Sequence, residues 1–441
     1  MEAVVDADVL VIGCGMAGLT AAAHAARAGA RVLAIDEADH PGGSAALSAG
    51  VIWAPASVDA YLEMDQGADP DLIGIVVDGL APGIELMRSL GVFVGERRRL
   101  DAVMNFAAVA YTFDVLTYLD RCRAAVVAAG GHLVTGASIG ALRVDGGVVH
   151  GATALDRDGE AEIEATATVL ATGGFQGDAE LRRKVLGEHG PAFVVRANKA
   201  SRGGGLRLAQ SVGGAVDVTT DKFYGNLLPT GIGRAFVTAD FHSLSQYQSI
   251  HSLLFDKRGR RLGDESVSYY ENAWLVSRTS DGRALLVGDA RSRALGVNAS
   301  LGYDRVSDAL SAGGRAVETS TLAALDDAVA GWGYAGVSEG VARFNESLGG
   351  GRPDEPARRF SHEPVACEPY FAIEVQPAIT FPFAGIRIDA STRVLRESGD
   401  VVDGLLAVGA DACVYRSIYG GGLSLAMSTG LVAASTAVAL L

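Results

Sequence analysis

The N-terminal part of the chain alternates short apolar runs with a helical stretch of small residues. Val9–Ile12 is continuously apolar, as expected of a parallel strand that is buried on both faces. Ala17–Ala28 is rich in alanine and is followed by Gly29, a common end signal for a helix. A second apolar run, Arg31–Ile35, closes at Asp36. This pattern predicts a β-α-β unit at the start of the chain.

The rest of the chain predicts a mixed α/β fold. From about Asp221 aromatic and polar residues alternate, which marks a change in character from the apolar runs before it. No internal repeat of fixed period occurs. The further elements that we expect are a strand hairpin over 134–154, a short buried strand over 165–171, helices within 307–348, short strands over 381–394 and a buried helix over 430–441.

The composition argues against several classes of function. The 441 residues include 37 Lys and Arg against 52 Asp and Glu, a net charge of −15, so no domain-wide basic field exists to collect the phosphates of a nucleic acid. The 4 cysteines lie far apart without a C-x-x-C pair, which argues against a metal site or a disulfide framework and fits a reducing cytoplasm. No signal-peptide pattern is visible, and the most apolar stretch is too short to span a bilayer. We therefore expect a cytoplasmic protein without a membrane span or a nucleic-acid partner.

Glycine is in excess, with 57 residues, and its clusters point to close contact between the backbone and a ligand. Gly13, Gly15 and Gly18 form a G-x-G-x-x-G sequence between the first predicted strand and the helix. The first glycine permits a tight turn, the second lets a pyrophosphate approach, and the third lets helix and strand pack closely. Asp36 ends the next strand, where a carboxylate binds ribose hydroxyls. Strand, glycines, helix and acid together predict a dinucleotide at the helix N-terminus.

A second glycine pair distinguishes between the two common dinucleotides. Gly42 and Gly43 are followed by the hydroxyls of Ser44 and Ser48 and then by Gly50. Such backbone and hydroxyl groups suit a pyrophosphate and a ribityl chain, whereas a plain NAD domain has no need of them. No second G-x-G-x-x-G follows a strand elsewhere in the chain. We therefore infer a single dinucleotide, FAD.

Several segments, taken in order, make the chain resemble a known superfamily. Besides the fingerprint and residues 41–44, they are ATGGF at 171–175, FDKRGRR at 255–261 and GLLAVG at 404–409. With these segments the chain is similar, over nearly its whole length, to the FAD-binding proteins of the fumarate reductase and 3-ketosteroid dehydrogenase superfamily. The match is closest to the 3-ketosteroid dehydrogenase branch.

The resemblance implies an α/β fold with two domains. A Rossmann-like, three-layer FAD-binding domain of the glutathione reductase type would comprise residues 1–220 and 376–441. An inserted α+β capping and catalytic domain would comprise residues 221–375. The substrate would then lie between the two domains, against the flavin.

The same resemblance implies how FAD is held. Members with covalently attached flavin carry a histidine near the Gly-Gly-Ser segment, and none stands between Ser44 and Gly50, so we expect non-covalent FAD. The residues expected to bind it are Gly13, Gly15, Met16, Ala17, Gly18, Asp36, Glu37, Gly42, Gly43, Ser44, Ser48, Gly50, Ile139, Ala171, Thr172, Gly173, Gly409, Asp411, Gly422, Leu423, Ser424 and Leu425.

Two positions separate the branches of the superfamily. Fumarate-reducing members bind and protonate a dicarboxylate with cations. In this chain Tyr269 stands in place of the first arginine, Tyr419 in place of the second, and Tyr415 in place of a histidine. Phenols lack the complementarity to carboxylates that a planar guanidinium has, so a small dicarboxylate substrate is disfavoured. Tyr419 and the GGGLSL sequence after it resemble the 3-ketosteroid dehydrogenases, especially the 4-ene-forming (5α) branch.

The expected chemistry is dehydrogenation beside a ketone. Tyr419 and a backbone N–H at a helix N-terminus would polarise the carbonyl and make the neighbouring C–H bond more acidic. Tyr269 would take that proton, with Tyr415 and Tyr270 as further candidates, and a hydride would pass to flavin N5. The predicted enzyme is a FAD-dependent oxidoreductase that acts on the CH–CH group of a cyclic apolar ketone, steroid-like or smaller.

Several alternatives stay open at this point. The same site run in reverse would make an ene-reductase of an unsaturated ketone or acid, and a third interpretation is a flavin-bearing binding or redox-sensing protein without turnover. Because Arg416 is close to the expected pocket, an anionic substrate stays an alternative. His242 and His251 are either catalytic or structural. Tyr61 and Tyr111 are candidates for a substrate-loop tyrosine. The sequence shows no nicotinamide-binding motif, so the electron acceptor could be oxygen, a quinone or another carrier.

Overall fold

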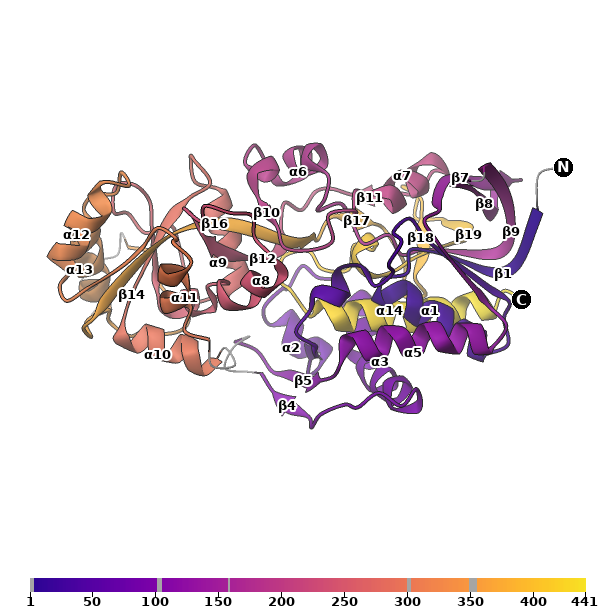
Figure 1. The fold of residues 1–441 in the computed structure, drawn as a ribbon, viewed down its shortest axis with the longest axis horizontal. Coiled ribbons are helices and arrows are strands. Elements are labelled where there is room, and N and C mark those ends of the chain that lie inside the picture. The colour runs from indigo at the N-terminus through magenta and orange to yellow at the C-terminus, as the bar shows by residue number, and fades with distance from the viewer. Residues whose placement is uncertain (1–3, 101–104, 158, 300–302, 349–354) are drawn as a thin grey trace.

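The computed structural model describes residues 4–100, 105–157, 159–299, 303–348 and 355–441, and Figure 1 shows how their elements are arranged. The predicted β-α-β start and terminal helix are both present. The helices are α1 (Met16–Arg27), α2 (Val58–Leu62), α3 (Pro70–Ser89), α5 (Val115–Ala128), α6 (Ala179–Leu186), α7 (Gly204–Ser211), α8 (Thr238–Ser243), α9 (Tyr269–Ser277), α10 (Ala290–Ala299), α11 (Arg305–Ser311), α12 (Leu322–Ala330), α13 (Val337–Ser347) and α14 (Gly422–Val438), with short 3-10 turns η1 (Gly43–Leu47), η2 (Gly190–Ala192), η3 (Tyr247–His251) and η4 (Gly409–Asp411).

Parallel strands form the middle of the first sheet. β1 pairs in parallel with β2 on one side and with β9 on the other, while β6 and β19 extend the parallel set beyond them. The apolar run in β1 is buried, with Val9, Leu10 and Val11 each at most 1% exposed, as its sequence predicts. The order is β18-β19-β9-β1-β2-β6, with β7 and β8 joined through β9. The strands are β1 (Val4–Ile12), β2 (Val32–Asp36), β6 (His132–Thr135), β7 (Ser138–Asp145), β8 (Val148–Asp156), β9 (Gly159–Leu170), β18 (Arg393–Leu395) and β19 (Val401–Ala407).

Helices from both ends of the chain cover this sheet. α1 connects β1 to β2 and packs against α5 and α14, which lie beside it in Figure 1. α14 begins at Gly422, earlier than the 430–441 stretch that its apolar composition marked. The extra turns matter because they bring the N-terminus of α14 to the edge of the sheet where β1, β2 and β9 end.

A second, six-stranded sheet lies away from the first, at the left of Figure 1. β16 runs through it and pairs with four other strands. The helical periodicity over 307–348 was misleading in one place, because residues within it form strand β15. Antiparallel pairing of β15 with β16 outweighs the local helical pattern there. The strands are β10 (Val194–Val195), β12 (Phe223–Pro229), β13 (Leu253–Phe255), β14 (Ala284–Asp289), β15 (Ala316–Thr319) and β16 (Tyr370–Pro382).

Two small sheets complete the fold. The remaining strands are β3 (Val51–Pro55), β4 (Arg98–Arg99), β5 (Ala108–Thr112), β11 (Val216–Asp217) and β17 (Gly385–Ile386). The domain limits inferred from sequence, 221–375 for the insert, stay a prediction. β10 and the end of β16 belong to the second sheet although those limits assign them to the FAD-binding part.

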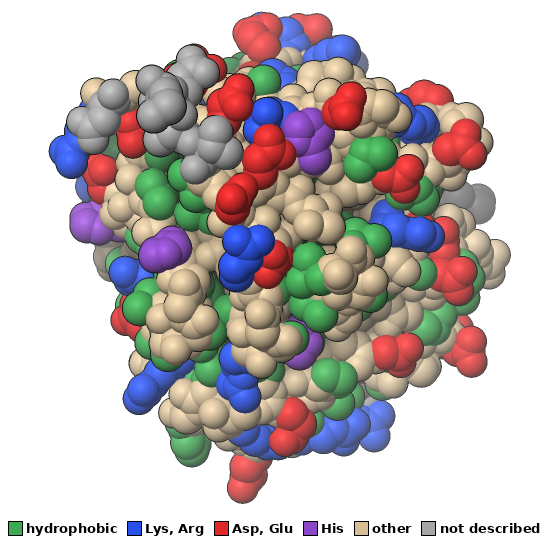
Figure 2. All heavy atoms as spheres, turned by 90° about the vertical axis from the view of Figure 1, so that its right-hand side faces the viewer, with side chains coloured by type: hydrophobic (Ala, Val, Ile, Leu, Met, Phe, Trp, Pro, Cys, Tyr) green, Lys and Arg blue, Asp and Glu red, His purple; other side chains and the backbone are tan. Residues whose placement is uncertain are grey.

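Charged side chains of both signs are mixed on one face of the molecule. Figure 2 shows Lys and Arg side chains interspersed with Asp and Glu on the face around the first sheet. Within the described ranges no helix is long and apolar enough to cross a membrane. Among the same residues no group of three or more His, Cys, Asp or Glu side chains is arranged to hold a metal ion.

Candidate active site

A cavity of about 1370 Å3 opens where the parallel strands of the first sheet end. Ile12 at the end of β1 and Asp36 at the end of β2 line it, as does Ala171 directly after β9. Ligands of open α/β sheets bind at this carboxyl edge. The volume exceeds the ~300–1,000 Å3 typical of a small-molecule pocket, which suits an extended dinucleotide together with a second small molecule.

The glycine turn after β1 shapes one end of this cavity. Gly13 has a φ of 106°, and a Cβ there would meet the Ala171 carbonyl oxygen at 2.3 Å, so only glycine fits. Gly15 precedes α1 without any side-chain cap, and a Cβ there would meet nothing within 4 Å. Free backbone N–H groups at a helix N-terminus that faces open space are what a pyrophosphate needs. The turn therefore fits the phosphates of FAD.

The two acidic residues at the end of β2 differ in their contacts. Asp36 accepts hydrogen bonds from the backbone N–H groups of Cys14 at 2.6 Å and Ala38 at 2.9 Å, which ties the glycine turn to β2. Each carboxylate oxygen has a further lone pair, so Asp36 retains capacity for ribose hydroxyls. Glu37 is exposed and also lines the cavity.

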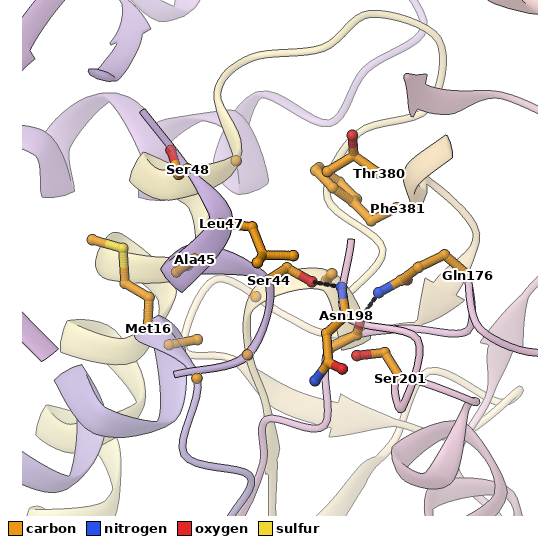
Figure 3. A pocket seen from close by; sticks show the side chains of 18 of the residues that line it. Met16, Ser44, Ala45, Leu47, Ser48, Gln176, Asn198, Ser201, Thr380 and Phe381 are labelled. Carbon is orange, nitrogen blue, oxygen red and sulfur yellow. Dashed lines mark hydrogen bonds between the residues drawn. The ribbon is translucent and has the colours of Figure 1, made fainter. Parts of the chain in front are cut away.

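Residues 196–202, which were not expected from the sequence, form a wall of the cavity beside η1. The Asn198 N–H donates to Ser44 Oγ at 3.0 Å, and Gln176 Nε2 donates to the Gly173 carbonyl at 3.0 Å. Figure 3 shows these contacts, with Thr380 and Phe381 of β16 across from η1. The one sequence signal for this wall was the glycine cluster at 203–205, directly after it.

Most residues expected to bind FAD line the cavity: Gly13, Gly15, Met16, Ala17, Asp36, Glu37, Gly43, Ser44, Ser48, Ile139, Ala171, Thr172, Gly173, Gly409, Gly422, Leu423 and Leu425. The other five lie behind that lining: Gly18, Gly42, Gly50, Asp411 and Ser424. Asp411 is an example of a residue that supports the lining without belonging to it. Its carboxylate accepts hydrogen bonds from the N–H groups of Thr172 at 2.5 Å and Gly174 at 2.8 Å and so holds that turn.

Phenol rings gather at the end of the cavity nearest the second sheet. Tyr269, the first residue of α9, and Tyr419, before α14, both line it as predicted. Tyr224 of β12 lies between them, with its ring centroid 3.7 Å from that of Tyr419 and 6.4 Å from that of Tyr269. Sequence reasoning did not select Tyr224, because only β12 pairing with β16 brings it here.

Tyr419 is connected to the N-terminus of α14. The Gly422 N–H donates to the Tyr419 hydroxyl oxygen at 2.7 Å. A phenol oxygen that accepts a hydrogen bond becomes a stronger donor through its own proton. The α14 backbone and the phenol therefore act at one point, which suits them to bind a carbonyl oxygen.

The phenols of this cluster differ in how costly their ionisation is. Burial raises the pKa of Tyr269 and of Tyr419 well above the ordinary value. Burial also raises the pKa of Tyr224, but the charge of Arg196 and hydrogen bonding with Tyr269 and Tyr419 oppose that rise. A negative charge in the cluster is therefore most favourable on Tyr224.

Two other predicted tyrosines lie behind the lining. The Tyr415 O–H donates to the Gly421 carbonyl oxygen at 2.8 Å. The Tyr61 O–H donates to the backbone carbonyl of Ile418. Both rings stack together with centroids 6.1 Å apart, beneath the segment that carries Tyr419. We infer that they position Tyr419, whereas Tyr270, 5.8 Å from it, packs against its ring.

Of the remaining candidate residues, two lie outside the cavity lining and two belong to it. Arg416 lies outside the lining, half exposed and paired with Asp217 at 3.0 Å. His251 also lies outside it, and burial lowers its pKa to about 4. His242 and Tyr111 do line the cavity.

Comparison with known proteins places the chain in context. A family model described as "FAD binding domain" matches residues 8–425. A 3-oxosteroid 1-dehydrogenase of Mycobacterium tuberculosis is 26% identical over 565 residues, covering 97% of each chain. A 4-oxocyclohexanecarboxylate 2-dehydrogenase of Sinomonas cyclohexanicum is 26% identical and covers 97% of this chain and 92% of its own. The solved 3-ketosteroid Δ1-dehydrogenase of Sterolibacterium denitrificans has the same fold, with a TM-score of 0.77 at 16% identity over 98% of this chain and 99% of its own.

Proposed function

The chain belongs to the FAD binding domain family and is a FAD-dependent oxidoreductase; we propose that it introduces a carbon–carbon double bond next to the carbonyl of a cyclic ketone. The observation that carries this proposal is the contact between the Gly422 N–H and the Tyr419 hydroxyl, 2.7 Å apart at the N-terminus of α14. A ketone oxygen bound there would accept a hydrogen bond from the Tyr419 O–H, which the Gly422 N–H makes a stronger donor. Its α-C–H bond would become more acidic. The steroid and oxocyclohexanecarboxylate dehydrogenases to which the chain is similar support a ring ketone as substrate.

The proton then needs a basic oxygen within the phenol cluster. We assign Tyr269 as the group that removes the α-proton and Tyr224 as the group that takes the hydroxyl proton of Tyr269 in the same step. The reacting form has Tyr224 as the phenolate: its pKa is raised overall, but Arg196 and the two neighbouring hydroxyls oppose that rise, so of the three phenols it ionises at the lowest cost. Both phenols end neutral, and the ketone becomes an enolate whose oxygen accepts the hydrogen bond of the Tyr419 O–H. Bound FAD would supply the two-electron acceptor for the hydride that leaves the β-carbon.

The cofactor is bound by the residues of the glycine turn and of η1. We propose that Gly13 and Gly15 hold the pyrophosphate, that Asp36 holds the ribose, and that the residues around Ser44 lie along the flavin side. No histidine stands between Ser44 and Gly50 to attach the flavin, so acid precipitation should release all of it.

The decisive experiment is anaerobic mixing of the purified holoenzyme with a ketone panel. The panel contains cyclohexanone, 4-oxocyclohexanecarboxylate and a saturated 3-ketosteroid. Loss of the oxidised flavin absorbance with any of them, together with formation of the enone, supports the proposal. If every member of the panel leaves the flavin oxidised, the proposed dehydrogenation is wrong.

The reverse reaction is the second candidate function. The same Tyr419 O–H that favours an enolate also polarises an enone, and microscopic reversibility allows Tyr269 to return the proton. Chemically reduced enzyme mixed with 2-cyclohexenone would then reoxidise and form cyclohexanone. Faster reoxidation by enones than reduction by ketones would assign the enzyme to reduction.

A further inference from the structure

Two arginines line the cavity beside the phenol cluster without a carboxylate partner. Arg305, the first residue of α11, is 5% exposed, and Arg196, directly after β10, is half buried. Neither forms an ion pair with any acidic residue of the described ranges within 4.0 Å. Among the residues that the structure describes, the acidic side chains that line the cavity are Asp36 and Glu37, at its adenosine end. The other end is therefore positively charged.

The hydrogen bonds of Arg305 leave part of its guanidinium unused. Its terminal nitrogens donate to the backbone carbonyls of Tyr303 at 3.3 Å and His242 at 3.1 Å. Its Nε is buried and has no hydrogen-bond partner among the residues that the structure describes. A buried cation that gains only neutral carbonyls has lost its hydration without recovering a charge partner.

Arg196 lies next to it. One of its terminal nitrogens donates to the Phe241 carbonyl at 3.2 Å, the neighbour of the carbonyl that Arg305 contacts, and its Nε is also buried without a partner. Both guanidinium groups contact Tyr247, Arg196 at its hydroxyl (3.4 Å) and Arg305 above its ring (4.7 Å). The Tyr247 ring in turn lies 4.7 Å from that of Tyr269. The two cations therefore share one corner of the cavity, against the phenols.

The surroundings of Arg305 disfavour its charge in the protein alone. The pKa of Arg305 is lowered to about 10, mainly by burial and in part by the charge of Arg196, while Tyr247 and Asp308 oppose the shift. Burial and both arginines lower the pKa of His242, so that side chain is neutral near pH 7. A bound anion would remove the repulsion and complete the hydrogen bonding.

We propose that this corner binds a carboxylate of the substrate, with Arg305 as the principal cation and Arg196 beside it. The inference rests on the proposed dehydrogenation and refines it: the substrate is a cyclic ketone that carries a carboxylate, not the apolar ketone expected from the sequence. The positions differ from those of Tyr269 and Tyr419, where dicarboxylate-binding members of the superfamily would have their cations.

The proposal is tested by binding, without turnover. Cyclohexanecarboxylate has no ketone, and cyclohexanecarboxamide is its neutral counterpart of nearly equal shape. Titration calorimetry of the holoenzyme should give at least 10-fold tighter binding of the acid. Arg305→Met should weaken acid binding about 10- to 100-fold and leave amide binding unchanged, whereas Arg305→Lys should recover part of the loss. Arg291→Met is the matched control, since its Nε is likewise unpartnered but its guanidinium pairs with Glu363 outside the cavity.

Equal binding of acid and amide by the wild-type protein would overturn the carboxylate site, and so would the absence of binding by either. That comparison needs no variant, so a failure of Arg305→Met to fold leaves the test intact. The two proposals also fail separately. Tight acid binding with no flavin reduction by any ketone would reject the dehydrogenation alone, while equal turnover of cyclohexanone and 4-oxocyclohexanecarboxylate would reject the carboxylate site alone.

Discussion

The rings of Tyr224 and Tyr419 stack face to face, with centroids 3.7 Å apart and planes inclined by 12°. One ring belongs to a strand of the second sheet and the other to the glycine-rich segment before α14. The stack joins the part of the chain that fits FAD to the part that brings Tyr269 and Arg196. The phenol that would bind the ketone and the phenol that best accepts a negative charge are thus in direct contact.

Replacing Tyr419 with phenylalanine should abolish most turnover. The ring and its stacking stay, but the hydroxyl that receives the Gly422 N–H and would bind the ketone is lost. We expect kcat to fall about 100- to 1,000-fold, the usual effect of removing one donor from a developing oxyanion. Rapid-mixing measurement of flavin reduction checks this. Tyr334→Phe is the control, because it removes a buried hydroxyl that lies outside the cavity. Unchanged turnover in Tyr419→Phe would refute its assignment as the group that binds the ketone.

Replacing Tyr224 with phenylalanine should move the pH dependence of flavin reduction. The reactive form has a phenolate in the cluster, so the rate rises with pH through the pKa of the group that ionises. In the wild-type protein that group is Tyr224, whereas in the variant it is Tyr269, whose pKa burial raises further. The rise should therefore shift to higher pH in a profile of the limiting rate. A uniform loss of rate with an unmoved profile would show that Tyr224 only packs.

Two alanine substitutions at either end of α1 separate backbone strain from cofactor binding. Gly13→Ala introduces a Cβ 2.3 Å from the Ala171 carbonyl, at a φ of 106°. Gly29→Ala has a similar φ of 97° but open space around the Cβ. We expect Gly13→Ala to purify without FAD or to fail to fold, while Gly29→Ala retains FAD and loses about 1 kcal/mol of unfolding free energy. Flavin content and urea denaturation give the two readings. Full flavin in Gly13→Ala would contradict the tight turn.

The buried pair of Arg261 and Glu265 should be important for stability. Both side chains are 0% exposed, and the Glu265 carboxylate also accepts the Leu254 N–H at 3.0 Å. Glu265→Ala removes the closer partner of this buried cation and leaves it only Glu355 at 3.9 Å, so the unfolding free energy should fall by about 3 kcal/mol. In the exposed pair with Asp256, Arg260→Ala should cost less than about 1 kcal/mol. Urea denaturation monitored by tryptophan fluorescence measures both, and equal losses would argue against the burial effect.

Local rules predicted the cofactor end of the site well. The G-x-G-x-x-G turn depends on neighbours a few residues apart, because the glycines, the strand before them and the helix after them form one unit. Gly13, Gly15 and Asp36 could therefore be placed before any fold was known, and all three line the cavity. The family and FAD followed from such segments.

The substrate end depends on contacts between distant parts of the chain. Tyr224 reaches Tyr419 because β12 pairs with β16, and Arg305 reaches Arg196 because α8 and α11 fold over the same corner. The residues next to Tyr224 or Arg305 in the sequence do not identify either as a candidate site residue. The acidity of a phenol and the pairing of a cation depend on the groups that pack around the side chain. Arg416 illustrates the converse: its sequence position beside Tyr419 drew attention, yet the fold pairs it with Asp217 outside the cavity. The motif sequence thus decided which cofactor is bound. Long-range packing, which sets burial and charge, decided which side chains gather at the other end of the cavity.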